Sequence, residues 1–178
     1  MRTSSYFTVF SMALMLGYYE GSMLGSLPGY FIFFRPVLPF LIFCFLLNRS
    51  QAAYLVAGIS GFVVDFISAT PSGFITARWL LVALIIDFVQ NYVITNKSLY
   101  GSWLMAVIAR IADGILTIMI YIVFNFIWGG LFIIEPVIFQ IPILFVDLIV
   151  ISILFLSVSL LTKRFLTFIP FEKNRYGS

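Results

Sequence analysis

The most regular feature of the sequence is a series of long apolar stretches separated by short polar, proline- or glycine-containing segments. A helix that crosses a membrane needs about 20 mostly apolar residues. These stretches are apolar on all sides, whereas the strands of a membrane β-barrel alternate between apolar and polar positions. We therefore predict an all-α, polytopic integral membrane bundle, a single domain over residues 1–178 with about six transmembrane helices. The predicted helices cover approximately residues 6–24, 35–47, 52–68, 74–94, 100–126 and 142–161.

Two of the predicted helices need comment. The first follows Met-Arg-Thr-Ser-Ser, a start that also fits a signal peptide, and we interpret it as an uncleaved first helix. The second is short, and Pro36 suits its first turn, where a missing N–H removes no hydrogen bond. Five spanning helices with one re-entrant segment are the alternative to six.

The composition supports a membrane protein and excludes several functional classes. Hydrophobic residues make up 62% of the chain and charged residues 10%, whereas a soluble domain carries about 25% charged residues. The absence of histidine excludes Ser-His-Asp catalysis and histidine-based zinc sites. The single cysteine, Cys44, has no partner for an intramolecular disulfide or a metal site. We expect membrane lipid as the environment, no cofactor, no metal and no nucleic-acid partner.

The basic residues predict an orientation. With six helices, both termini lie on one side, and the side richer in Lys and Arg faces the cytoplasm. Arg35 and Arg78 fall on the other side, so we predict cytoplasmic N- and C-termini. The basic tail at 162–178 is an orientation signal or a contact for anionic lipid or a cytoplasmic filament. The inner basic residues are Arg2, Arg49, Lys97, Lys163, Arg164, Lys173 and Arg175.

Small residues recur at every fourth position in two of the predicted helices, which places them on one helix face. Small residues on such a face allow another backbone to approach closely within a membrane. We interpret these faces as packing surfaces within the bundle, with docking of a partner protein as the alternative, above all for the first helix. The positions are Gly17, Gly21 and Gly25, and then Ala53, Ala57 and Gly61.

Charged residues within or near the predicted helices form the second group of candidates. They are costly in lipid and usually face a bundle interior, a cavity or each other. Arg110 and Asp113 are three residues apart and can pair, with Asp87 as a second possible partner of Arg110. We favour structural ion pairs over a ligand cavity, a proton path or a catalytic aspartate pair. These residues are Glu20, Asp65, Arg78, Asp87, Arg110, Asp113 and Asp147.

Catalysis by paired aspartates has recognisable motifs, and the chain lacks them. Neither the Gly-x-Gly-Asp motif of intramembrane aspartyl proteases nor the Asn-x-x-Asp-Arg box of lipoprotein signal peptidases occurs. We therefore expect a protein that is not an enzyme.

The most specific stretch is Gly61-Phe-Val-Val-Asp65-Phe-Ile-Ser68-Ala-Thr-Pro71-Ser-Gly73. It is a helix end with a polar stop, in which Pro71 blocks continuation and Gly73 permits a tight turn into the next helix. The stretch resembles the signature of the rod shape-determining MreD family at Gly61, Asp65, Ser68, Pro71 and Gly73.

The resemblance extends over about residues 35–94, because Arg35-Pro36-Val-Leu-Pro-Phe-Leu-Ile also looks like the proline-led second helix of that family. Two positions depart from the family pattern. Val37 replaces an acidic residue that often follows the proline, and Ala69 stands where a glycine is common.

The resemblance implies a non-enzymatic scaffold subunit of the rod complex, or elongasome, in the bacterial cytoplasmic (inner) membrane, supporting cell shape and peptidoglycan synthesis. It implies an MreC-like bitopic partner, RodA and a class B penicillin-binding transpeptidase, with MreB reached indirectly. The family is also similar in fold to substrate-binding S-components of energy-coupling-factor vitamin transporters. Such an S-component, using the interior residues Arg78, Asp87 and Arg110, is the alternative function.

Overall fold

The computed structural model describes residues 3–23, 35–47, 49–68, 73–93, 99–128 and 140–166. Their backbone is almost entirely helical, with no strand in these ranges, which confirms the all-α class. Each of the six predicted segments overlaps one α-helix, and the predicted ends differ from the observed ones by up to six residues. The elements are α1 (Thr3–Tyr18), the π-helical turn η1 (Tyr19–Met23), α2 (Val37–Leu46), α3 (Ser50–Ile67), α4 (Phe74–Tyr92), α5 (Leu99–Trp128) and α6 (Gln140–Leu166).

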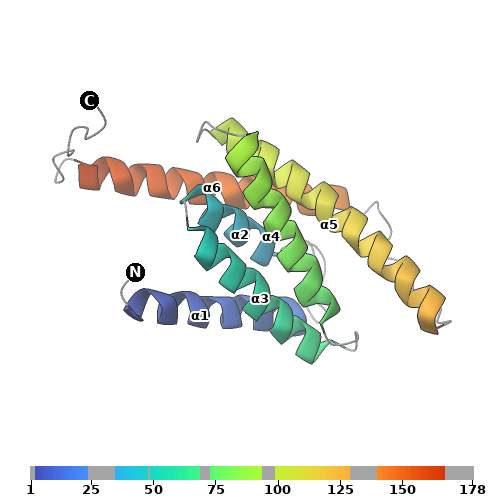
Figure 1. Cartoon of the computed structure of the whole chain (residues 1–178). Helices are drawn as coiled ribbons and strands as arrows, with labels where there is room; N and C mark the ends of the chain where they lie inside the picture. Colours follow the sequence, from blue (N-terminus) through green and yellow to red (C-terminus); the bar gives the residue numbers. More distant parts are fainter. Residues whose placement is uncertain are drawn as a thin grey trace, which may run out of the picture.

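Consecutive helices run in alternating directions, so that α1 begins and α6 ends on the same side of the bundle (Figure 1). Neighbours in the chain pack together as the pairs α3–α4 and α4–α5, and α1 packs against α3. The short helix α2 contacts α3, α4, α5 and α6. Seven of its ten residues are buried, so α2 forms the centre of the hydrophobic core.

Three helical segments are long and apolar enough to cross a membrane: Ser50–Ile67, Phe74–Tyr92 and Leu99–Ile120. Two shorter apolar helical segments accompany them, Val37–Leu46 and Pro142–Ser157. A helix of ten residues is about 15 Å long, which is half the thickness of a bilayer's hydrocarbon core. The chain therefore has transmembrane character, and α2 is the helix that fits a complete span least well.

On α5, some exposed and some buried side chains are the opposite of those expected in a soluble protein. On α5, large apolar side chains such as Ile111, Ile115 and Met119 are exposed, whereas Arg110 and Asp113 on the same helix are buried. Water would favour the opposite arrangement, because apolar groups gain from burial and charged groups lose by it. A hydrocarbon environment accounts for both features at once, since it solvates isoleucine well and charges poorly.

The small residues predicted to form packing faces lie at contacts within the chain. A Cβ atom on Gly17 would lie 2.8 Å from the Ser60 Cα, and one on Gly21 would lie 3.3 Å from the Ile67 side chain. The absence of a side chain at these positions thus lets α1, through Gly17, and η1, through Gly21, approach α3 closely. Ala53 and Ala57 are fully buried in the hydrophobic core. Gly25 lies outside the described residues.

Candidate functional site

The start of α4 is held by a carboxylate from α3. The buried Asp65 accepts hydrogen bonds from the Ile75 amide at Oδ1 and from the Thr76 amide at Oδ2, both at 2.9 Å. The Thr76 hydroxyl donates a third bond, at 2.6 Å, to Oδ2. The first amides of any helix lack acceptors within that helix, and a carboxylate at this end is also favoured by the helix dipole. Asp65 therefore performs the task of an N-cap residue from a neighbouring helix.

Two glycines of the same motif make this cap possible. Gly73, the residue before α4, has φ of 99°, a left-handed conformation that glycine adopts without strain. A Cβ atom on Gly61 would lie only 2.6 Å from the Thr76 Cα, so this position must lack a side chain for α3 and α4 to come together. The motif residues Gly61, Asp65 and Gly73 thus form one hairpin joint, which we call the α3–α4 cap. Pro71 lies outside the described residues.

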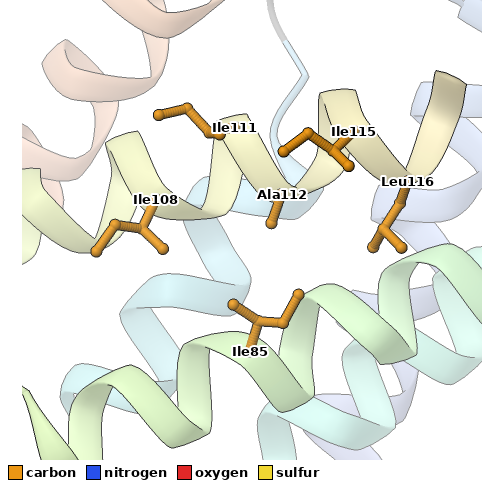
Figure 2. Close-up of a pocket in the computed structure, with 6 residues that line it drawn as sticks. All are labelled: Ile85, Ile108, Ile111, Ala112, Ile115 and Leu116. Atoms are coloured by element: carbon orange, nitrogen blue, oxygen red, sulfur yellow. The ribbon is translucent and has the colours of Figure 1, made fainter. Parts of the chain in front are cut away.

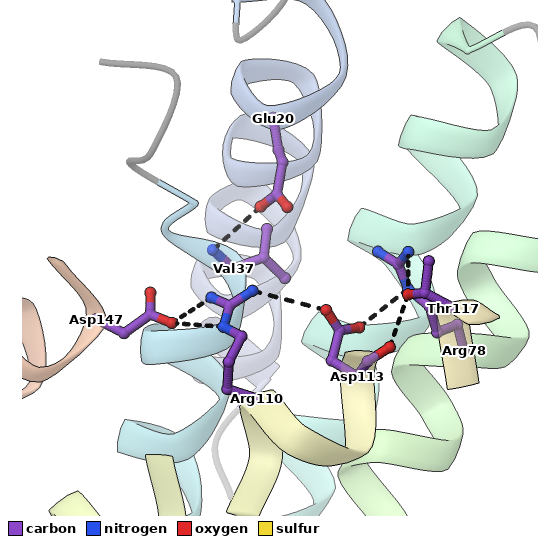
Figure 3. A network of polar contacts seen from close by, with 7 residues as sticks. All are labelled: Glu20, Val37, Arg78, Arg110, Asp113, Thr117 and Asp147. Atoms are coloured by element: carbon purple, nitrogen blue, oxygen red, sulfur yellow. Dashed lines mark hydrogen bonds and ion pairs between the residues drawn. The ribbon is translucent and has the colours of Figure 1, made fainter. Parts of the chain in front are cut away.

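A chain of alternating charges links α4, α5 and α6 (Figure 3). Arg78 Nε lies 3.0 Å from Asp113 Oδ1, and Arg110 Nη1 lies 3.6 Å from Asp113 Oδ2. Arg110 also donates to Asp147 Oδ2, from Nε at 3.0 Å and from Nη2. Arg78 Nη1 donates to the Thr117 hydroxyl at 3.1 Å. We call the residues Arg78, Asp113, Arg110 and Asp147 the charge chain.

The charge chain is buried and electrically balanced. Its two arginines and two aspartates sum to zero, and Arg110, Asp113 and Asp147 are all 5% exposed or less. Alternation matters here, because a buried charge is tolerated when an opposite charge satisfies it. The charge chain therefore links three helices, and its four members carry no net charge among themselves.

Glu20 adds a further polar contact to this interior. The Val37 amide, the first of α2, donates to Glu20 Oε2 at 3.3 Å (Figure 3). The carboxylate also lies within electrostatic range of the arginines at 35, 78 and 110. Glu20 therefore anchors the start of the central helix α2 to the π-helical turn that ends the first helical segment.

Asp87 lies apart from the charge chain. The sequence offered it as a second partner of Arg110, but that role is taken by Asp147. Asp87 accepts hydrogen bonds from the Tyr54 hydroxyl at 2.9 Å and from Asn91 Nδ2 at 3.3 Å. Its partner Tyr54 belongs to α3, so the Asp87 side chain faces α3 rather than Arg110 on α5.

Asp87 borders a polar recess of about 300 Å³ where α2 ends, α3 begins and α4 ends. The Gln90 side-chain amide closes one wall by donating to the Phe45 carbonyl oxygen at 2.8 Å. Phe45 also packs edge-on against Tyr54, with 5.9 Å between ring centroids. We call this space the Asp87 recess; it is lined by Phe45, Ser50, Asp87, Gln90 and Asn91.

A second space is a groove of about 280 Å³ between α4 and α5 (Figure 2). Ile85 projects from α4 toward a row of apolar side chains on α5, so the groove offers hydrocarbon contacts and no hydrogen-bonding side chain. Its chemistry suits the apolar part of a lipid or of a membrane helix. The α5 residues that line it are Ile108, Ile111, Ala112, Ile115 and Leu116.

Several polar partners were not among the candidates from the sequence. Thr76 occupies the third position of α4, where the amide of any helix needs an acceptor, and this rule could have identified it. Thr117 and Tyr54 carry no such signal, since their partners lie 39 and 33 residues away. In the part of the chain that the structure describes, no cluster of three or more acidic or cysteine side chains could hold a metal ion.

Comparison of the chain with protein-family models, curated proteins and solved structures found no match.

Proposed function

We propose that this chain is a non-enzymatic membrane subunit of the MreD type, which supports cell shape and peptidoglycan elongation in the bacterial inner membrane. The observation that carries the proposal is the α3–α4 cap, in which the motif residues Gly61, Asp65 and Gly73 act as one joint. A signature whose members work together physically is stronger support for a resemblance than separate matches in an apolar sequence. In this proposal the bundle has six membrane segments and both termini in the cytoplasm.

The charge chain also favours a scaffold. Arg78, Arg110, Asp113 and Asp147 engage each other across three helices and line neither the Asp87 recess nor the apolar groove. Buried charges that pair only in one arrangement of helices favour that arrangement over others, which an interaction subunit needs in order to present a fixed surface. An MreC-like bitopic protein is the proposed direct partner, with RodA, a class B penicillin-binding transpeptidase and MreB reached through the complex.

Affinity purification of the chain with an MreC-like protein from the same cell tests the proposal. We expect the two proteins to purify together in mild detergent. Gly61→Ala, which would push α3 and α4 apart, should weaken that association and disturb rod morphology. Gly58→Ala is the matched control on the same helix, because its Cβ would meet only Leu80 Cδ2, at an ordinary 3.9 Å.

Two outcomes would overturn the proposal. The first is that no MreC-like protein associates with the wild-type chain at any expression level. The second is that mass spectrometry finds a vitamin-like molecule bound in stoichiometric amount, with association to a transporter ATPase, which would establish the S-component alternative instead.

A further inference from the structure

We draw no further inference here: the strongest candidate, the exposed apolar face that Ile111, Ile115, Ile118 and Ile122 form along α5, is an unpartnered helix face, and nothing in the structure shows what covers it.

Discussion

The α3–α4 cap and the charge chain both place ionisable groups inside an apolar bundle, but they satisfy them differently. In the cap, one carboxylate meets the amides and hydroxyl of a helix start ten and eleven residues further along the chain. In the charge chain, Arg110 meets Asp147 from a helix 37 residues away, and Asp113 joins Arg110 to Arg78. The cap needs only one hairpin to form, whereas the charge chain needs three helices in place.

This difference separates local folding from assembly of the bundle. A hairpin whose cap comes from its own first helix brings its groups together at low entropic cost, because the connecting loop is short. The charge chain forms only when α4, α5 and α6 have met, so it selects among arrangements of helices that already exist. We therefore infer that the cap determines the geometry of the α3–α4 hairpin, whereas the charge chain determines which helices pack together.

The largest loss of stability is expected when Arg110, at the centre of the charge chain, is replaced. Arg110→Met leaves Asp147 buried without its only ion-pair partner among the described residues. Removing one member of a buried ion pair typically costs about 3–5 kcal/mol, and we expect a loss of that size in unfolding free energy. Unfolding in detergent micelles, followed by tryptophan fluorescence, measures it.

A compensating variant shows whether pairing is the cause. Asp113 keeps Arg78 as a partner when Arg110 is lost, so Asp147 is the aspartate left without an ion-pair partner among the described residues. Combining Arg110→Met with Asp147→Leu should restore most of the lost stability, because apolar replacement of a whole buried pair is often neutral. A double variant as unstable as the single one would show that Arg110 acts through something other than its charge.

The second largest effect is expected in the cap. Asp65→Ala deprives two amides and one hydroxyl at the start of α4 of their acceptor. Loss of a capping side chain and unsatisfied buried donors together predict a loss of about 2–3 kcal/mol. Hydrogen exchange should locate the change in the first turn of α4, with protection of α6 unaffected. Uniform loss of protection across all helices would contradict the local role of the cap.

The sequence predicted the helices because the apolar stretches are local. The observed α4 (Phe74–Tyr92) and the predicted 74–94 begin at the same residue and differ only at the C-terminal end. Helix α6 continues to Leu166, whereas the prediction ended at 161. That prediction took the approach of Lys163 and Arg164 as the end of the apolar span, but lysine and arginine are good helix formers. Polarity there does not end the helix.

The two regions also differ in how much of each could be predicted. The cap residues Gly61, Asp65 and Gly73 lie within 13 positions, and their spacing alone suggested a helix end followed by a turn. Pairing of Arg110 with Asp113 was equally local. The link from Arg110 to Asp147 depends on which helices are neighbours, and uniformly apolar surfaces carry no pattern that specifies neighbours.

The cap also depends on the close approach of α3 and α4 at Gly61, which a third substitution tests. Gly61→Ala adds a methyl group that would meet the Thr76 backbone, which cannot move without displacing α4. Overpacking of this kind predicts a loss of about 1–2 kcal/mol in unfolding free energy. Gly58→Ala, with ample room, should be neutral or slightly stabilising, since alanine favours helices over glycine. Equal melting temperatures for the two variants would refute the close approach of α3 and α4.

The smallest expected effects compare the two regions directly through one matched substitution. Thr76→Val removes the hydroxyl that donates to Asp65 at 2.6 Å, and Thr117→Val removes the hydroxyl that accepts from Arg78 at 3.1 Å. We expect a loss of about 1–2 kcal/mol for Thr76→Val, because its bond is to a buried carboxylate. Thr117→Val should cost less than about 1 kcal/mol, since Arg78 keeps its ion pair with Asp113. If Thr117→Val were the more destabilising variant, the charge chain would depend on its hydroxyl more than the cap depends on that of Thr76. The cap would then not be the more self-contained of the two regions.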